Sequence, residues 1–208
     1  MVTQLVLIRH GSTAWNKEYR YCGFTDIELN NKGKIQARRL RERLKSQGVD
    51  RIYTSDRKRA IQTAGIIFEG YDIEKIPDLR EMHFGIFEGL TYKEILKRYP
   101  EIYKEWIENP FGTVIPSGEN LDIFKKRVVR TFNKIIAKHP NQSIAIVCHG
   151  GAISIFITHI LKTRDFWKYI PDSASLSILE VKDKKFKIRV FNDVRHLYGI
   201  KIDPVRFK

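Results

Sequence analysis

The sequence predicts an α/β fold in three layers (α/β/α), with helices on both faces of a mostly parallel central sheet. Short apolar runs, typical of buried strands, alternate along the chain with longer stretches in which apolar residues recur at helical spacing. Strands that alternate with helices in this way form parallel sheets covered on both faces. Near the end of the chain, residues 175–181 and 186–191 predict a hairpin, which would add an antiparallel edge to the sheet.

Four short segments are the predicted parallel strands, at residues 4–8, 51–54, 73–76 and 143–148. The last of these is the most apolar, so we expect it near the centre of the sheet. No apolar run approaches the roughly 18 residues of a membrane-spanning helix. The first run is also too short for a signal peptide. We therefore expect a cytoplasmic protein with no membrane partner.

The predicted helices show apolar residues at a period of 3.6, with capping residues at their ends. Asn30 or Asn31 is suited to cap the first helix, which ends near Gly48. Its apolar residues are Ile35, Leu40 and Leu44. The longest helix covers residues 119–138, with Leu121, Phe124, Val128, Phe132, Ile135 and Ile136 in its apolar stripe. The others are expected around residues 61–68, over 91–99 and 101–108, and over 152–161.

Composition limits the class of protein and its partners. The chain has 208 residues, which favours one domain over residues 1–208, and 42% of them are hydrophobic, which excludes a disordered chain. The net charge of +14 favours acidic partners such as nucleic acid, an anionic membrane surface or a phosphorylated small molecule, or serves solubility alone. Cys22 and Cys148 are too few for a disulfide framework.

Residues that can bind phosphate follow the predicted strands. Ligands of open α/β sheets bind beyond the carboxyl ends of the strands. Arg9 and His10 follow the first strand, His149 follows the strand 143–148, and Arg59 lies in the helix after the second strand. Glycines after both histidines leave backbone N–H groups open to an anion, and arginine offers a planar fork for phosphate oxygens. We therefore expect a site for a dianionic phosphate.

Histidine in such a site can act as a nucleophile toward phosphorus, giving a phosphohistidine. Neighbouring cations would stabilise the oxygens of the transition state, and an acid must protonate the leaving oxygen. Either Glu81 or Glu88 could supply that proton if burial raises its pKa. A metal site is the competing use of these residues. The six histidines show no metal-binding spacing, however, and the arginines would repel a divalent cation, so we expect no metal.

Five segments carry a resemblance that covers nearly the whole chain. They are Leu-Ile-Arg-His-Gly-Ser-Thr-Ala-Trp-Asn at 7–16, Gly-Phe-Thr-Asp at 23–26, Tyr-Thr-Ser-Asp-Arg-Lys-Arg-Ala-Ile-Gln-Thr-Ala at 53–64, Leu-Arg-Glu-Met-His-Phe-Gly-Ile-Phe-Glu-Gly at 79–89 and Cys-His-Gly-Gly at 148–151. With these motifs the sequence resembles the histidine phosphatase superfamily, also called phosphoglycerate-mutase-like. The resemblance implies that fold, with neither a metal nor an organic cofactor.

The resemblance also implies roles for individual residues. His10 would be phosphorylated, His149 would be the second catalytic histidine, and Glu81 would be the proton donor. The residues expected to bind the substrate phosphate are Arg9, Asn16 and Arg59. Further substrate contacts are expected from Cys22, Gly23, His83 and Gly150. Phe87 stands where the family commonly has Trp, a departure outside this catalytic set.

The resemblance leaves two reactions open. We favour a metal-independent phosphomonoesterase acting through phosphohistidine, because residues 90–118 are shorter than the insertion of cofactor-dependent phosphoglycerate mutases, which are the alternative. Within the phosphatase branch, the acid motif is similar to that of α-ribazole phosphatase. We expect residues 90–118 to form a lid over the site, with Trp106 and Phe111 lining it. The expected partner is a small phosphorylated substrate, bound by a monomer or a homodimer.

A basic nucleic-acid-binding module is the alternative from another class, suggested by the net charge. Basic residues crowd two predicted helices, at positions 38–45 and 125–130. They mostly alternate with apolar positions, as on a solvent-exposed helix face. No aromatic–basic stacking motif or zinc finger accompanies them. We therefore expect no specific nucleic-acid partner.

Overall fold

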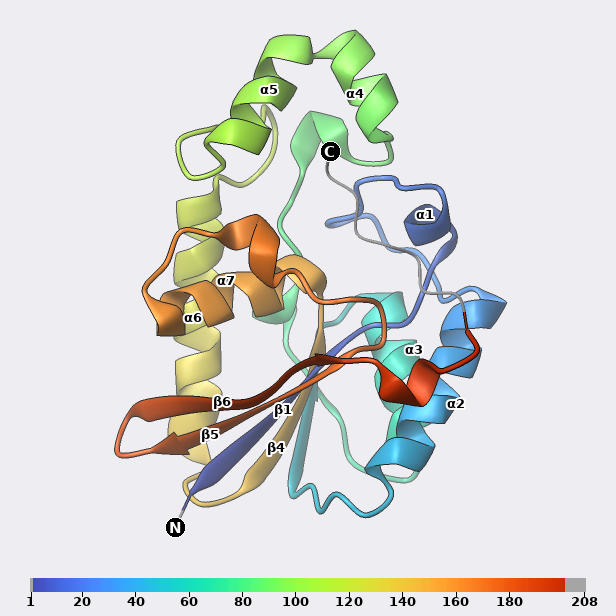
Figure 1. The fold of residues 1–208 in the computed structure, drawn as a ribbon, viewed down its shortest axis with the longest axis vertical. Helices are drawn as coiled ribbons and strands as arrows, with labels where there is room; N and C mark the ends of the chain where they lie inside the picture. The colour runs from blue at the N-terminus through green and yellow to red at the C-terminus, as the bar shows by residue number, and fades with distance from the viewer. Residues whose placement is uncertain (1, 201–208) are drawn as a thin grey trace.

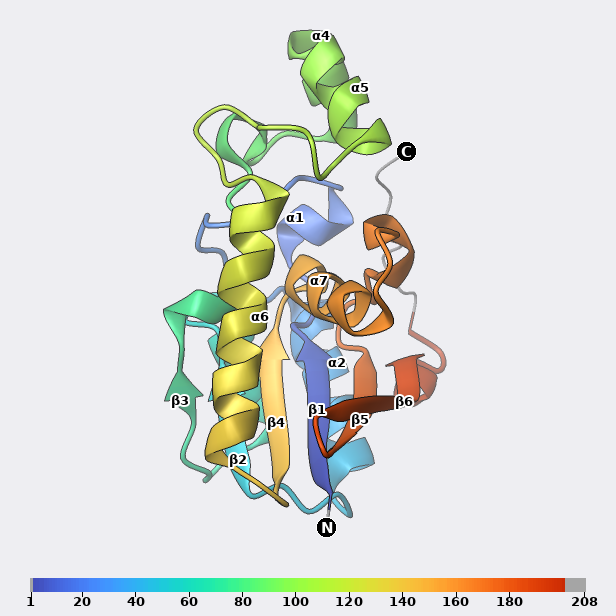
Figure 2. The ribbon, with the colours of Figure 1, turned by 90° about the vertical axis from the view of Figure 1, so that its left-hand side faces the viewer.

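The computed structural model describes residues 2–200, which form a six-stranded sheet with helices on both faces (Figures 1 and 2). The strands are β1 (Thr3–Arg9), β2 (Arg51–Thr54), β3 (Glu74–Lys75), β4 (Ser143–Cys148), β5 (Leu176–Lys182) and β6 (Lys185–Asp193). The helices are α1 (Ala14–Lys17), α2 (Asn31–Leu44), α3 (Lys58–Ile67), α4 (Tyr92–Arg98), α5 (Pro100–Glu108), α6 (Leu121–Lys138) and α7 (Gly150–Leu161). Short 3-10 helices cover Pro77–Leu79, Gly85–Phe87, Phe166–Tyr169 and Arg195–Leu197.

The sheet has the strand order β3-β2-β4-β1-β5-β6. The first four strands in this order are parallel, whereas β5 pairs antiparallel with β1 and forms a hairpin with β6. This confirms both the mostly parallel sheet and its antiparallel edge. The register pairs Arg9 with Cys148 and Thr54 with Val147, so β1, β4 and β2 end side by side. The residues that follow these strands therefore lie together, beyond the carboxyl ends of the strands.

Alternating strand residues separate two hydrophobic layers, because successive side chains of a strand point to opposite faces. Leu5 and Leu7 of β1 pack in the larger cluster, which holds the buried residues of α6 and α7. Val6 and Ile8 pack in the smaller cluster with α2 and α3. Strands buried on both faces read as continuous apolar runs, which explains the composition of β1 and β4.

Side-chain caps fix several helix starts. Asn30 caps α2 by accepting a hydrogen bond from Gly33 N at 2.8 Å, as the sequence suggests. Asn120 caps α6 in the same way, accepting from Ile123 N at 2.8 Å. The placement of Ile35 in the apolar stripe of α2 is wrong, because this side chain is 45% exposed. The buried face of α2 instead runs through Gly33, Gln36, Ala37, Leu40 and Leu44, and position 35 lies outside it.

Residues 90–118 lie beyond the carboxyl ends of the strands, with α4 and α5 side by side at one end of the molecule (Figure 1). Trp106 of α5 is fully buried and contacts the rings of Phe84, Phe166 and Trp167. The segment is thus anchored in the larger hydrophobic cluster. Within residues 2–200, no helix is long and apolar enough to cross a membrane.

Candidate active site

A cleft opens at the carboxyl ends of the central strands β1 and β4. Its polar lining includes Arg9, His10, Asn16, Glu81 and Gly150, all of them expected site residues from separate parts of the sequence. The other residues that line it are Trp15, Tyr19, Arg20, Tyr21, Cys22, Phe84, Gly151, Phe166, Trp167, Ile170 and Ser173. The cleft is therefore lined by both charged or polar side chains and aromatic rings.

The two histidines lie next to each other beside this cleft, where His10 lines it and the buried His149 does not. His10 follows β1 and His149 follows β4, and the parallel register of these strands brings the side chains together. Their ring centroids lie 5.2 Å apart, with the ring planes at 63°. His10 is 5% exposed and His149 is fully buried. Water therefore has little access to either ring.

The surroundings of His10 keep its ring neutral. Its Nδ1 lies 2.8 Å from the carbonyl oxygen of Gly11. A carbonyl only accepts hydrogen bonds, so Nδ1 carries the proton and Nε2 keeps its lone pair. Burial lowers the pKa of His10 well below 6.5, and the charges of Arg59 and Arg9 lower it further. The ring therefore stays neutral at pH 7, as attack on phosphorus requires.

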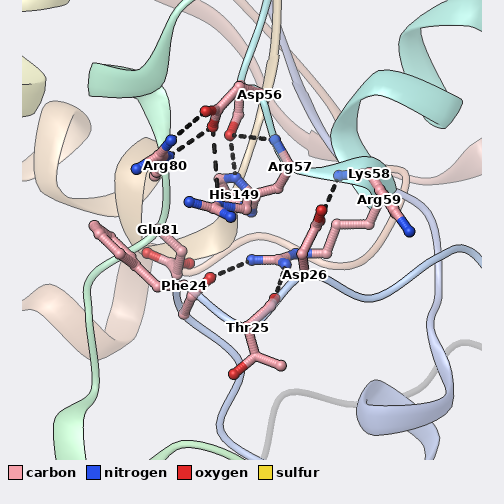
Figure 3. A network of polar contacts seen from close by, with 12 residues as sticks. Phe24, Thr25, Asp26, Asp56, Arg57, Lys58, Arg59, Arg80, Glu81 and His149 are labelled. Atoms are coloured by element: carbon pink, nitrogen blue, oxygen red, sulfur yellow. Dashed lines mark hydrogen bonds and ion pairs between the residues drawn. The ribbon is translucent and has the colours of Figure 1, made fainter.

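Three buried nitrogens of the expected phosphate-binding residues have no hydrogen-bond partner within residues 2–200. They are Nε of Arg9, Nε of Arg59 and Nδ1 of His149. The remaining guanidinium contacts go to the backbone. Arg9 donates to the carbonyl of Pro171 at 2.5 Å. Arg59 donates to the carbonyl of Gly23 at 2.7 Å and to that of Thr25 at 2.9 Å (Figure 3). Buried donors are rarely left unsatisfied, so these nitrogens mark a site for an anion with several acceptor oxygens.

Asn16 is oriented by the start of α1. Its Oδ1 accepts hydrogen bonds from the backbone N of Thr13 at 3.0 Å and from the hydroxyl of Thr13 at 2.9 Å. In return, Asn16 N donates to the Thr13 hydroxyl, which completes a capping box. With Oδ1 occupied, the Nδ2 group is the part of this side chain that can donate to a ligand in the cleft.

Glu81 lies on the cleft as the candidate acid. Its two oxygens accept hydrogen bonds from the backbone N of Met82 at 3.0 Å and of Gly151 at 2.8 Å. Burial raises the pKa of Glu81, and this effect outweighs the lowering by those hydrogen bonds and by nearby arginines. A carboxyl group with a raised pKa can donate a proton to a leaving oxygen.

Neighbouring charged residues hold the segment that carries Glu81. Arg80 forms a bidentate ion pair with Asp56, which follows β2 (Figure 3). Arg127 of α6 donates to the carbonyl oxygens of Asp78 at 2.9 Å and Arg80 at 3.0 Å. It also forms an ion pair with Glu119 at 2.6 Å. The backbone around Glu81 is therefore fixed from both sides.

Glu88, the other acid considered from the sequence, has a different role. Its carboxylate accepts hydrogen bonds from the backbone N atoms of Gly23, Phe24, Thr25 and Phe84, at 2.8–3.3 Å, and from the hydroxyl of Thr25 at 2.8 Å. Glu88 does not line the cleft. It organises the loop beside the site, which leaves Glu81 as the candidate acid.

The remaining expected contacts divide into two groups. Cys22 and Gly150 line the cleft, whereas Gly23 and His83 do not. The peptide groups of Gly23 are bound to Arg59 and Glu88, and the ring of His83 packs edge-on against Phe24 at a centroid distance of 4.7 Å. Trp106 and Phe111, expected to line a lid over the site, do not line the cleft either.

The aromatic residues of the cleft and one serine were not among the expected site residues. Trp15, Phe166 and Trp167 line the cleft from a four-residue helix and a 3-10 helix, where no periodicity distinguishes them. Ser55 contacts the second histidine, with its Oγ 2.8 Å from His149 Nε2. The one sequence signal for a site role of Ser55 was its position directly after a predicted strand.

Arg9, His10 and Glu81 line one cleft, whereas Arg59 and His149 do not line it. A neutral histidine, an arginine and a carboxyl group of raised pKa are together suited to phosphoryl transfer. Comparison with known proteins gives the family. The model of the histidine phosphatase superfamily (branch 1) matches residues 5–194. The chain therefore belongs to this superfamily.

Two curated relatives from Arabidopsis thaliana are similar over most of the chain. Phosphoglycerate mutase-like protein 4 is 38% identical over 200 residues, covering 93% of this chain and 86% of the relative. A metal-independent phosphoserine phosphatase is 33% identical over 204 residues, covering 96% of this chain and 85% of the relative. Among solved structures, the α-ribazole phosphatase of Shigella flexneri superposes with a TM-score of 0.85 at 28% identity, covering 91% of this chain and 96% of that one.

Proposed function

We propose that this chain is a metal-independent phosphomonoesterase that hydrolyses a small phosphorylated metabolite through a phosphorylated His10. The enzyme class, phosphoric monoester hydrolase, follows from the superfamily and from relatives that are phosphatases. The observation that carries the mechanism is the neutral His10, whose Nδ1 proton is held by the Gly11 carbonyl, beside Glu81 on the same cleft.

The first half-reaction transfers the phosphoryl group to histidine. Nε2 of His10 attacks phosphorus with its lone pair, forming an N–P bond as the ester P–O bond breaks. Glu81 gives its proton to the leaving alcohol and becomes a carboxylate. Nε of Arg9, Nε of Arg59 and the Nδ2 group of Asn16 donate to the phosphoryl oxygens, where negative charge develops.

The second half-reaction regenerates the enzyme. A water molecule takes the place of the alcohol beside Glu81, which is now a base and removes the water proton as oxygen attacks phosphorus. The N–P bond breaks, inorganic phosphate leaves, and both Glu81 and His10 return to their initial states. One carboxyl group thus serves both steps, which requires a pKa above that of an exposed glutamate.

Two of the similar proteins support a small substrate: one is a phosphoserine phosphatase and the other an α-ribazole phosphatase. Which alcohol this chain releases depends on the cleft wall. The relative with a mutase-like name points to the alternative reaction, phosphoryl return to a second position of the substrate. Hydrolysis is favoured because residues 90–118 are shorter than the insertion expected of a mutase.

A panel of phosphomonoesters tests this function. Phosphoserine, α-ribazole phosphate, 4-nitrophenyl phosphate and 3-phosphoglycerate with 2,3-bisphosphoglycerate would be assayed with EDTA present. We expect phosphate release from at least one ester, undiminished by EDTA and absent from His10→Ala. Isomerisation without phosphate release would overturn hydrolysis, and strong inhibition by EDTA would overturn metal independence.

We also infer that residues 1–208 act as a single domain in which residues 90–118 cover the site. This segment supplies no residue that lines the cleft. Trp106 instead packs behind Phe84, Phe166 and Trp167, which do line it. A lid role would therefore be indirect, because a shift of α5 would move the aromatic wall. Trp106→Ala should therefore change KM. It should have a smaller effect on the rate at which His10 is phosphorylated at saturating substrate.

A further inference from the structure

Within the described part of the chain, the ring of His149 makes one hydrogen bond, and its partner is Ser55. Its Oγ lies 2.8 Å from Nε2 of His149, and both side chains are fully buried. Ser55 follows β2 directly, and its backbone N donates to the carbonyl of Val147 in β4 at 3.0 Å. The hydroxyl group is thus held on a rigid strand end beside the histidine.

The direction of this hydrogen bond follows from the donors and acceptors available. A serine hydroxyl has one proton to give and two lone pairs. One lone pair faces the backbone N–H of Arg57, at 3.4 Å. Within residues 2–200, the hydroxyl proton has no acceptor other than Nε2 of His149. A buried hydroxyl that does not donate costs free energy, so Ser55 donates and Nε2 accepts.

We propose that Ser55 is a positioning residue that fixes the tautomer of His149. Because burial keeps His149 neutral, an accepting Nε2 leaves the ring proton on Nδ1. Nδ1 is buried and has no partner within residues 2–200, as is true of Nε of Arg9 and Nε of Arg59. An N–H at this atom donates to the phosphoryl group, whereas a lone pair there would repel it.

Two neutral histidines then have different functions in one site, one as nucleophile and the other as hydrogen-bond donor. The Gly11 carbonyl holds the proton of His10 on Nδ1, which leaves Nε2 as the nucleophile. The Ser55 hydroxyl holds the proton of His149 on Nδ1, which makes that atom a donor. This inference rests on the proposed function for its chemical consequence. The tautomer itself is a property of the resting protein.

Nitrogen NMR on protein labelled with ¹⁵N-histidine tests the tautomer without any substrate. The His149 signals are assigned by their loss in His149→Asn. We expect the protonated, pyrrole-type signal at Nδ1 and the unprotonated, pyridine-type signal at Nε2. A pyridine-type Nδ1 in the wild-type protein would overturn the proposal. Because this measurement needs no turnover, it is independent of any failure of the proposed function.

Kinetics of three variants test the consequence. Ser55→Ala should lower kcat about 100-fold, the lower end of the effect of losing one preorganised donor, and should shift the His149 proton toward Nε2. Ser55→Thr keeps the hydroxyl and should keep both the Nδ1 proton and most of kcat. Ser177→Ala, which removes another buried hydroxyl bound to Asn192 N at 3.0 Å, is the control and should change neither. A Ser55→Ala variant with wild-type kcat would contradict the proposal.

Discussion

Arg59 and Glu88 bind the same loop, residues 22–25, through opposite sides of its peptide groups. Arg59 donates to the carbonyl oxygens of Gly23 and Thr25, at 2.7 and 2.9 Å. Glu88 accepts from the backbone N atoms of Gly23, Phe24 and Thr25, at 2.8–3.3 Å. The loop therefore lies between a cation and an anion. Since Arg59 is also expected to bind the phosphate, loop geometry and phosphate binding are coupled.

Replacing Glu88 tests the structural side of this relationship. Glu88→Gln keeps one acceptor oxygen but loses the charge that strengthens the hydrogen bonds, so the free energy of unfolding should fall by about 2 kcal/mol. Urea denaturation measures the change. Glu105→Gln, an exposed position in α5, is the matched control and should change stability by less than about 0.5 kcal/mol. Equal stability of the two variants would show that Glu88 does not hold the loop.

Replacing Glu81 tests the acid. For an alkyl phosphate, Glu81→Gln should lower kcat by about 10²- to 10⁴-fold, because a poor leaving group needs a proton. For 4-nitrophenyl phosphate the loss in the first step should be much smaller, since the phenolate leaves without one. Burst kinetics separates the two half-reactions. The same loss of the first-step rate for both substrates would exclude Glu81 as the acid.

The pH profile gives a second readout of Glu81. Burial raises its pKa, so its proton is lost at a higher pH than that of an exposed glutamate. kcat/KM for the alkyl phosphate should therefore fall on the alkaline side, and Glu81→Gln should remove this limb of the profile. An unchanged alkaline limb in the variant would assign it to another group.

Gly151 leaves space for Glu81. A Cβ at position 151 would lie 2.3 Å from Oε1 of Glu81, closer than van der Waals contact allows. Gly151→Ala should therefore displace the carboxyl group and lower kcat about 100-fold, with little further loss when combined with Glu81→Gln. Gly65→Ala in α3, where a Cβ meets nothing within 4 Å, should leave kcat unchanged. Additive losses in the double variant would contradict this account.

The two buried histidines should make the protein sensitive to acid. Burial lowers the folded-state pKa of His10 and of His149 well below 6.5, so below about pH 6.5 the unfolded state binds protons that the folded state does not. Stability is therefore full above that pH and falls as the pH drops, by up to about 1.4 kcal/mol per pH unit for each histidine. Urea denaturation at pH 5 and 7.5 should show a smaller pH effect in His10→Ala than in the wild type. An identical pH dependence would mean that His10 is not held neutral.

Most of the fold could be predicted because its signals are local. The alternation of strands and helices, the strand 51–54 and the Asn30 cap are each encoded within a few residues, and the structure confirms them. Ile35 shows the limit of periodicity. It fits an apolar spacing on its own helix, but which face is buried depends on the sheet beneath.

The site residues at strand ends and in motifs could be predicted from the sequence. Those that distant loops bring together could not. Glu81 and Glu88 follow the same short strand, so their positions alone did not separate them, and only the family resemblance pointed to Glu81. The contacts that do so come from residues 22–25, more than fifty positions away in the chain. The aromatic wall of Trp15 and Trp167 likewise depends on how loops meet across the cleft.

Trapping the covalent intermediate tests the central claim most directly. The enzyme would be mixed with a ³²P-labelled phosphomonoester, quenched rapidly in alkali, digested and mapped. We predict a label on the peptide that contains His10, stable in alkali, lost in acid and absent from His10→Ala. An acid-stable label, or a label that persists in His10→Ala, would contradict a mechanism through phosphorylated His10.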